Sequence, residues 1–408
     1  MKASERAAKR SNAKAPGRAP GRAGSAGSPR AGAPAEQPFP PRRLVGLIGK
    51  PAAEWTVHDL IRLFKSQGLR LVSLMHVGGD GWLKTLDFVP RSDEHLRDIL
   101  EGGERADGSS LFRGTGIETG RSDIVLRPRL ESAFLDPFAS QPTLIVLCGH
   151  FGRDGKPLPE SPDTIVRAAH DRLRKKTGID LMALGEVEYF LGKKPEESDV
   201  YGADDRGYHA SSPFVFGEGL RRRALEVLAE IGLPIKYGHS EVGYIGARDT
   251  DDFIWEQHEI ELALTDLPEA AEAVALTQWV LRNLAQRSAM RASFDPIMRK
   301  GHAGSGLHFH FSPVWKGEHA AEHVGGRFRE PAQWLIAGLV QFGPALMAFG
   351  NRTSGSFARL SQGKEAPHAV MWGDADRRAL IRIPISAKTE DGRLVSPPTI
   401  EFRLPDGS

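Results

Sequence analysis

Two histidines alternate along a predicted strand in the segment Gly304–Ser312, which reads GSGLHFHFS. Side chains two residues apart on a strand point to the same face of a sheet, so His308 and His310 share a face. Glu186 and Glu188 alternate in the same way farther upstream. Hard cations such as Mg²⁺ prefer oxygen ligands and also accept an imidazole. Because such polar groups are costly on apolar strands unless they are paired, the pattern predicts a divalent-metal site.

Arginines accompany these candidate ligands. Glu401 and Arg403 fall on one face of a strand predicted at Thr399–Leu404. A guanidinium group matches phosphate or carboxylate with two parallel hydrogen bonds. The combination predicts a site for phosphoryl transfer, with metal and nucleotide balancing the clustered charges. No glycine-rich Rossmann or Walker pattern follows a predicted strand, so those nucleotide sites are not indicated.

Length and composition set the class of protein. The chain has 408 residues, enough for two or three domains, and 40% of them are hydrophobic, as in globular proteins. Cys148 is the single cysteine, so no intrachain disulfide can form and we expect a reducing compartment, the cytoplasm. No run of 18 apolar residues occurs, so we expect no membrane span.

The basic charge is concentrated at the N-terminus. Residues 1–43 carry ten Lys or Arg against Glu5 and Glu36, and they are rich in Ala, Gly, Pro and Ser. We predict a disordered basic tail, with a transit peptide or a nucleic-acid-binding arm as alternatives. The other 365 residues hold 44 basic and 50 acidic groups, so for the folded part we expect no nucleic-acid partner.

Hydrophobic periodicity predicts two regions of mixed structure. The first has a helix at Val57–Gln67 and a hairpin of Leu71–Val77 with Trp82–Phe88, and prolines between 157 and 162 end it. The second alternates strands with long helices. Its predicted strands are Leu181–Phe190, Ile235–Tyr244, His258–Leu264, Gly306–Ser312, Ala369–Trp372, Leu380–Pro384 and Thr399–Leu404, and its predicted helices are Thr164–Lys176, Gly219–Ile231, Pro268–Ser288 and Pro331–Phe349.

Ten short motifs occur in order along the chain. They are ADGSS (106–110), SDIVLRP (122–128), GEVEYFL (185–191), HSEVG (239–243), EQHEI (256–260), GSGLHFHFS (304–312), the segment 351–360, KEAP (364–367), WGDADRRALIRIP (372–384) and IEFRLPD (400–406). Any one motif is weak, but together they resemble the glutamine synthetase family from about Leu71 to Asp406.

The resemblance implies an α+β fold and an activity. We expect a small β-grasp domain at 44–155, then a glutamine-synthetase-type catalytic β-barrel-like domain with outer helices at 156–408, without the family's C-terminal region. The implied reaction activates the γ-carboxylate of glutamate with ATP as an acyl phosphate, and ammonia then displaces phosphate. Two Mg²⁺ or Mn²⁺ ions per site are implied, as is a homo-oligomeric ring with active sites between subunits.

The resemblance also assigns roles to individual residues. For the metal near glutamate and ammonia, the implied ligands are Glu188, Glu241 and Glu259. For the metal that carries the ATP phosphates, they are Glu186, His308 and Glu401. The implied nucleotide-binding residues are Arg382, His310 and Ser312, and the implied substrate-binding residues are Arg359, Arg403 and Gly304. The implied catalytic residues are Asp107, Glu365 and Arg377.

The chain departs from the family pattern beside this core. The spacing from Glu241 to Glu259 is longer than in the family, Ala303 stands where an asparagine helps to bind glutamate, and Lys236 stands where a nucleotide-contacting glutamate is common. Two alternatives therefore stay open. One is a γ-glutamyl ligase that uses another amine, and the other is a non-catalytic homologue of glutamine synthetase.

Overall fold

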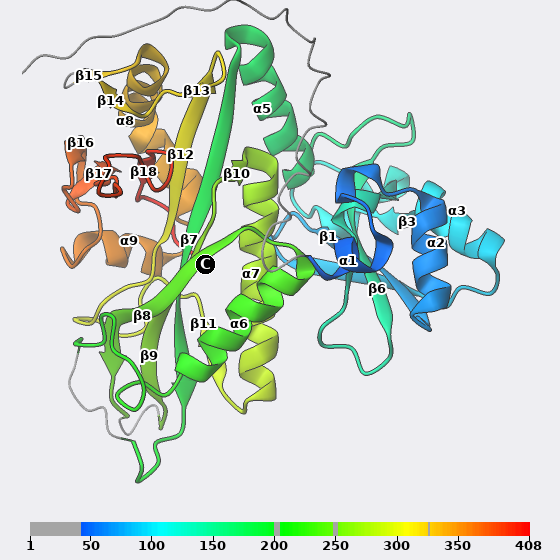
Figure 1. Ribbon diagram of the computed structural model, residues 1–408, viewed down its shortest axis with the longest axis horizontal. Helices are drawn as coiled ribbons and strands as arrows, with labels where there is room; N and C mark the ends of the chain where they lie inside the picture. Colours follow the sequence, from blue (N-terminus) through cyan, green and yellow to red (C-terminus); the bar gives the residue numbers. More distant parts are fainter. Residues whose placement is uncertain (1–41, 200–204, 248–251, 325–326) are drawn as a thin grey trace, which may run out of the picture. The chain divides into compact units, whose positions relative to one another are not determined.

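The computed structural model describes residues 42–199, 205–247, 252–324 and 327–408 (Figure 1). The predicted disordered tail therefore lies outside the described residues, except for its last two positions. The described residues belong to one compact unit.

The first region contains a mixed sheet. Among the described residues its strands run in the order β2-β1-β6-β4-β3, and β5 pairs with β6. β1 pairs in parallel with β6 and antiparallel with β2, so the predicted hairpin is confirmed. The strands are β1 (Leu71–Val77), β2 (Leu83–Phe88), β3 (Glu104–Asp107), β4 (Asp123–Pro128), β5 (Phe134–Leu135) and β6 (Thr143–Phe151). The helices are α1 (Arg43–Ile48), α2 (Val57–Ser66), α3 (Asp93–Gly102) and α4 (Gly108–Leu111).

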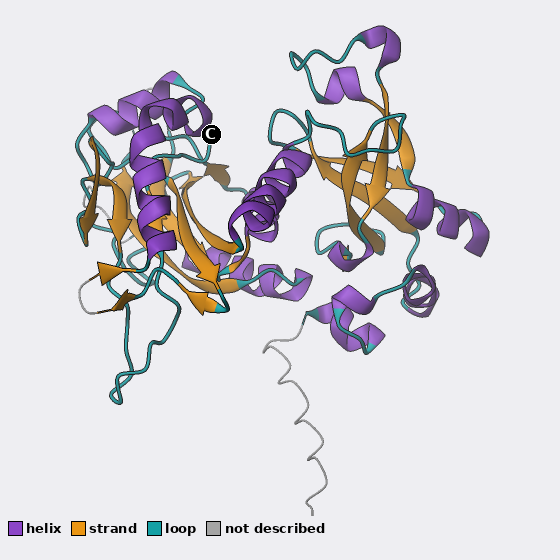
Figure 2. Ribbon diagram, turned by 90° about the horizontal axis from the view of Figure 1, so that it is seen from above, coloured by secondary structure: helices purple, strands orange, loops and turns teal. Residues whose placement is uncertain are grey.

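The second region is built on a larger sheet, which Figure 2 shows curled rather than flat, with helices packed along it. Its strands follow the order β16-β17-β18-β12-β7-β9-β8, with β10 and β11 on β7 and β13 on β12. The strands of this path are β7 (Ile179–Lys193), β8 (Ile235–Ile245), β9 (Ile254–Leu262), β12 (Leu307–Trp315), β16 (Ala369–Asp374), β17 (Ala379–Ile383) and β18 (Ile400–Phe402). The short strands are β10 (Thr265–Asp266), β11 (Arg291–Ser293), β13 (Glu318–His319), β14 (His323–Val324) and β15 (Arg327–Phe328), of which the last two pair with each other.

The helices of the second region begin and end where local sequence signals place them. Prolines occupy the first turns of three helices, where their missing N–H is harmless, and glycines with left-handed φ end two. The helices are α5 (Pro162–Thr177), α6 (Glu218–Ile231), α7 (Leu267–Arg287), α8 (Glu330–Gly350) and α9 (Ser354–Ser361). The predicted helices and strands of this region are therefore present, with shifted ends, and α9 is a helix that periodicity did not predict.

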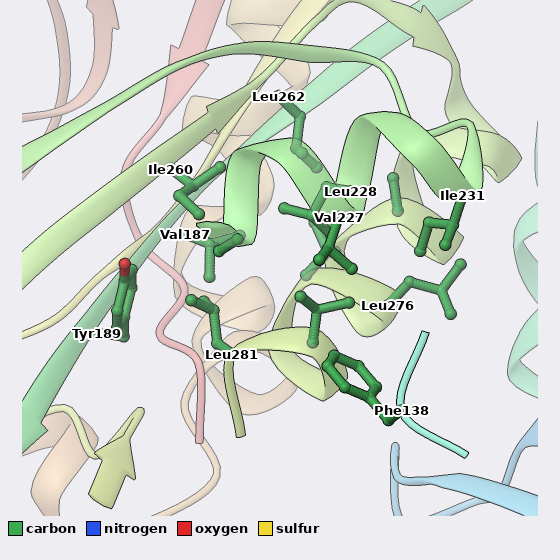
Figure 3. Packing of buried hydrophobic residues seen from close by; sticks show 14 of the residues in the cluster. Phe138, Val187, Tyr189, Val227, Leu228, Ile231, Ile260, Leu262, Leu276 and Leu281 are labelled. Atoms are coloured by element: carbon green, nitrogen blue, oxygen red, sulfur yellow. The ribbon is translucent and has the colours of Figure 1, made fainter. Parts of the chain in front are cut away.

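Strand alternation gives the larger sheet one apolar face and one acidic face. On β7, Val187 and Tyr189 are buried in the cluster that contains Leu228 of α6 (Figure 3). Glu186 and Glu188 occupy the intervening positions, so they point to the other face. β9 alternates in the same way. The helices α6 and α7 thus cover the apolar face, and the acidic face is left for the site.

Helix α8 is an exception to the expectation that no segment could span a membrane. By length and composition it is apolar enough to cross a bilayer, and it is the one such helix among the described residues. Ala332 and Ile336 are buried in a cluster with β17 and β18, whereas Trp334, Phe342 and Phe349 are exposed. Length and composition alone are weak evidence for a span, because core helices pass the same test.

Candidate active site

Strand register brings the predicted ligands into one band across the acidic face. His308 on β12 lies opposite Glu186 on β7, and His310 lies opposite Glu401 on β18. Farther along the sheet, Glu188 lies opposite Glu259 on β9. The residues come from segments more than 200 positions apart in sequence. The prediction that they share one face is therefore in agreement with the register.

Both histidines donate to one buried carboxylate. His308 Nδ1 lies 2.9 Å from Glu186 Oε2, and His310 Nε2 lies 2.9 Å from Glu186 Oε1. His308 Nδ1 is also 3.6 Å from Glu401 Oε1. Burial alone would raise the pKa of Glu186, but His310 and His308 hold this pKa well below its ordinary value. His310, predicted to bind nucleotide, thus lies in the same cluster as His308.

Glu401 is fully buried and is held by two arginines. The guanidinium groups of Arg382 and Arg403 each donate to a different carboxylate oxygen of Glu401. Burial raises the pKa of Glu401, but the charges of Arg403, His310 and His308 together outweigh burial, so the pKa is lowered. We call Glu186, His308, His310 and Glu401, with these two arginines, the balanced cluster. Its negative charges are compensated by the chain itself.

A second acidic group lies on β8 and β9. His239 Nε2 is 3.2 Å from Glu259 Oε1, and His239 Nδ1 is 3.7 Å from Glu241 Oε1. Burial, together with the charge of Glu188, raises the pKa of Glu241 to about 8. Burial and the neighbouring glutamates also raise the pKa of Glu259 well above its ordinary value. We call Glu188, Glu241 and Glu259, with His239, the unbalanced cluster, because no arginine or lysine is hydrogen-bonded to its carboxylates among the described residues.

Residues of both clusters line a common cavity, here called the carboxylate cavity. Arginines from four different segments reach it, together with the backbone of Gly304. The lining residues are Glu186, Glu188, Tyr208, Tyr237, His239, Glu241, Gln257, Glu259, Gly304, His308, Arg359, Lys364, Glu365, Ala366, Arg377, Arg382 and Arg403. The cavity therefore combines hard oxygen donors, imidazoles and guanidinium groups.

Arg359 is buried beneath the cavity. Its guanidinium donates to the backbone carbonyl oxygens of Leu404 (3.1 Å), Pro405 (3.2 Å) and Arg403 (3.2 Å). Its Nη2 also lies 3.4 Å from His308 Nε2. The side chain thus both lines the cavity and fastens the chain that follows β18.

Four predicted site residues do not line this cavity: His310 and Glu401, which lie in the balanced cluster, and Asp107 and Ser312, which lie outside both clusters. Asp107 is exposed at the end of β3, where its carboxylate accepts hydrogen bonds from Ser109 and Ser110. Ser312 is fully buried, and its hydroxyl lies 2.8 Å from His319 Nδ1 and donates to the Pro398 carbonyl at 3.0 Å. Their predicted roles remain predictions.

Sequence reasoning missed several cavity residues. His239 alternates with Glu241, and Gln257 alternates with Glu259, so strand periodicity could have found both. Gln257 Nε2 lies 3.3 Å from Glu188 Oε2, and Gly306 N–H donates to the same oxygen at 2.6 Å. Tyr208 lies in a turn before α6, outside any helix or strand, so no periodicity could have indicated it.

The donor set fits divalent cations. Glu188 and Glu259 are directly opposite each other on neighbouring strands, and so are Glu186 and Glu261, an arrangement that is unfavourable without a counter-charge. Three groups among the described residues offer three donor atoms within 4.8 Å of one another: Glu186 with His310 and Glu401, Glu241 with His239 and Glu259, and Glu186 with Glu259 and Glu261. The raised pKa values of Glu241 and Glu259 indicate the same lack of positive charge.

Comparison with known proteins identifies the family. Residues 159–408 match the model of the glutamine synthetase catalytic domain. The glutamine synthetase of Thermus thermophilus is 30% identical over 365 residues, which cover 87% of this chain and 76% of that protein. The glutamine synthetase of Methanocaldococcus jannaschii is 28% identical over 364 residues, with 86% and 76% coverage. The chain is therefore a glutamine synthetase-like ligase by class, and it belongs to the glutamine synthetase family.

Two further similarities mark the range of this family. A 3-hydroxylaminophenol mutase of Cupriavidus pinatubonensis is 30% identical over 385 residues, covering 86% of this chain and 77% of that protein. Plasmodium falciparum glutamine synthetase, solved by cryo-EM, superposes with a TM-score of 0.71 at 19% identity, covering 86% of this chain and 71% of that one. The similarity to the solved structure supports the fold. The similarity to a mutase means that family membership alone does not identify the substrate.

Proposed function

We propose that this protein is an ATP-dependent ligase that activates the γ-carboxylate of glutamate as an acyl phosphate and condenses it with ammonia to give glutamine. The observation that carries the proposal is the convergence of five glutamates and two imidazoles on a cavity that four arginines also line. Carboxylates in such number call for cations, and arginines call for anionic substrates.

The two clusters would hold one divalent cation each, Mg²⁺ or Mn²⁺. Glu186, His308 and Glu401, with His310 adjacent, would hold the cation on the nucleotide side, and Glu188, Glu241 and Glu259 the other. When bound, such ions neutralise charge on the phosphates and on the carboxylate under attack. Ammonia would bind beside the unbalanced cluster, where carboxylates can accept its protons.

The arginines would bind and orient the two anionic substrates. Arg377 and Arg382 would contact the phosphates, since both reach the cavity from the strand pair β16–β17 or the turn between them. Arg359 would pair with the α-carboxylate of the acid, beside Gly304, and Arg403 would lie near the transferred group. Donors fixed in place before reaction stabilise charge in the transition state at little reorganisation cost.

Asp107 would complete a neighbouring subunit's site. It does not line the carboxylate cavity of its own chain, and the family relatives lead us to infer an oligomeric ring. Mixing inactive Asp107→Ala and Arg377→Ala proteins tests this arrangement. If sites are shared, mixed oligomers recover part of the activity, because some sites then contain neither change. No recovery after confirmed subunit exchange would contradict the shared site.

One assay tests both the ligase proposal and the alternative in which another amine replaces ammonia. Purified protein is given ATP, Mg²⁺ and glutamate with a panel of amines that includes ammonia, and phosphate and amide product are both measured. Ammonia-dependent formation of glutamine supports the proposal. Amide formation only with another amine would replace ammonia by that amine, an outcome that Ala303 and the long spacing from Glu241 to Glu259 favour. No amine-dependent phosphate release at all would overturn the ligase proposal.

A further inference from the structure

One carboxylate outside the two clusters connects three segments around the carboxylate cavity. Asp205 Oδ2 accepts a hydrogen bond from Lys364 Nζ at 2.8 Å, and Asp205 Oδ1 accepts one from the Tyr244 N–H at 3.3 Å. His302 Nδ1 lies 3.5 Å from Asp205 Oδ1. Asp205 thus contacts the end of β8, the loop before Gly304, and the segment that carries Glu365.

The segment that carries Glu365 has an uncommon backbone conformation. Glu365 has a φ of 48°, in the left-handed region that residues other than glycine rarely adopt. The Ala366 N–H donates to the Lys364 carbonyl at 2.5 Å, which closes a three-residue turn around Glu365. Such conformations persist only where the surroundings hold them, and they concentrate at functional sites.

Two side chains hold this turn from different directions. Arg403 Nη2 donates to the Glu365 carbonyl at 2.6 Å, which links the turn to the balanced cluster. On the other side, Lys364 is bound to Asp205. Lys364, Glu365 and Ala366 all line the carboxylate cavity. The turn is therefore fixed at the rim of the cavity by one contact to the sheet and one contact to Asp205.

We propose that Asp205 and Lys364 are positioning residues whose ion pair keeps the Lys364–Glu365–Ala366 turn over the activated acid and so limits the entry of water. This inference rests on the proposed ligase function. In the productive step the amine nitrogen bonds to the acyl carbon, the bond from that carbon to the phosphate oxygen breaks, and the amine loses a proton. If water attacks instead, the free acid and phosphate form, and ATP is spent without an amide.

The ion pair suits a test of this role, because its removal should barely affect folding. Lys364 is about half exposed, and exposed ion pairs contribute little to stability. Lys364→Met removes the charge and keeps the length of the side chain. Lys364→Arg keeps the charge and serves as the rescue variant. Lys300→Met, at an exposed lysine outside the cavity lining, is the matched control.

The first readout is the ratio of phosphate released to amide formed, at saturating ATP, acid and the amine that the wild type uses. We expect Lys364→Met and Asp205→Asn each to raise this ratio about fivefold, equivalent to about 1 kcal/mol. The double variant should be no worse than either single variant, because both remove one interaction. Lys364→Arg and Lys300→Met should match the wild type. An unchanged ratio in Lys364→Met, or additive effects in the double variant, would overturn the inference.

The second readout does not depend on activity. Hydrogen exchange followed by mass spectrometry, on peptides that cover residues 360–370, reports the amide of Ala366 and its neighbours. We expect faster exchange in Lys364→Met than in the wild type and no change in Lys300→Met. Unchanged exchange in Lys364→Met would show that the pair does not hold the turn. If Lys364→Met exchanges faster but the wild type releases no phosphate with any amine, the ion pair does hold the turn and the ligase function is rejected.

Discussion

The two acidic clusters of the carboxylate cavity differ in how their charge is balanced. In the balanced cluster, Arg382 and Arg403 bind Glu401, and both histidines donate to Glu186. In the unbalanced cluster, Glu241 and Glu259 share one imidazole, that of His239.

The pKa values follow this difference. Burial is similar in both clusters, yet the pKa of Glu186 and of Glu401 is lowered, whereas the pKa of Glu241 is raised to about 8. The neighbouring cations, and not the depth of burial, decide the direction. The chain itself thus compensates the charge of the balanced cluster, whereas no arginine or lysine among the described residues is hydrogen-bonded to the carboxylates of the unbalanced cluster.

The largest expected effect follows from breaking the balanced cluster. Glu401→Gln should lower the free energy of unfolding by about 3–5 kcal/mol, because two buried guanidinium groups lose their carboxylate. Urea unfolding of the metal-free protein measures this loss. Glu390→Gln, the same change at an exposed position, is the control and should stay within about 0.5 kcal/mol of the wild type. A loss in Glu401→Gln no greater than in the control would show that the arginines do not need this carboxylate.

A buried pair without carboxylates separates burial from charge. His76 and His150 are nearly inaccessible, their ring nitrogens lie 3.0 Å apart, and burial lowers the pKa of each to about 4. A folded pKa below the unfolded value of 6.5 means that stability is fully present above pH 6.5 and is lost as the pH falls toward 4.

This pair should therefore make unfolding strongly pH-dependent below neutrality. Between pH 7 and pH 4 we expect a loss of roughly 3 kcal/mol from each of these groups. The slope of unfolding free energy against pH should be smaller in His150→Asn, while the exposed His58→Gln change should leave it as in the wild type. Equal slopes in His150→Asn and the wild type would contradict neutral burial of the pair.

The unbalanced cluster should respond in the opposite direction. Its Glu241 has a folded pKa raised to about 8, so stability is full below pH 4.5 and is lost as the pH rises through 8. Between pH 6.5 and 8, metal-free wild type should lose stability, and Glu241→Gln should lose less, because only Glu259 of the two raised carboxyl groups remains. A divalent cation at 100 times its Kd should stabilise the wild type by about 2.7 kcal/mol, and Glu241→Gln less.

Thermal unfolding with and without Mg²⁺ measures these differences, and Glu390→Gln again serves as the control. Equal responses of Glu241→Gln and wild type to pH and to the cation would remove the distinction between the two clusters.

Replacement of Arg359 tests which of the two anionic substrates this residue binds. Arg359→Ala should raise the KM of the acid by an amount equivalent to about 1.5–3 kcal/mol and leave the KM of ATP nearly unchanged, because a charged contact to a carboxylate is lost. Steady-state kinetics with each substrate varied measures the two constants, on protein whose fold is checked by circular dichroism. If the KM of ATP rises while the KM of the acid substrate stays the same, Arg359 binds the nucleotide instead.

The smallest effect on folding is expected at Asp107, far from either cluster in sequence. Its carboxylate caps the short helix α4, so Asp107→Ala should lower the free energy of unfolding slightly. Denaturant unfolding measures this cost, and Ser140→Ala, at an exposed loop position, is the control. A loss of several kcal/mol would mean that Asp107 has a structural role beyond the cap.

Much of the fold and the site could be read from local pattern. Alternation on β7 and β12 placed Glu186 with Glu188 and His308 with His310 on one face each, and the helices α5 to α8 follow from their apolar spacing. The reason is that side-chain direction on a strand or helix depends on the nearby backbone alone. The helix α9 was missed, because its short segment has no long apolar period and begins with a Thr353–Ser356 capping box.

What the sequence by itself determined is therefore which residues face one side of each element and which chemistry they can supply. Only the tertiary structure decided which of these faces meet. The register of β12 against β7 and β18 brings both histidines to Glu186, and the path of residues 359–405 brings Arg403 under Glu365 and Arg359 onto three carbonyls. The link between Asp205 and Lys364 joins positions 159 residues apart. Such contacts arise from the packing of whole elements, so no local pattern encodes which cluster is balanced and which is not.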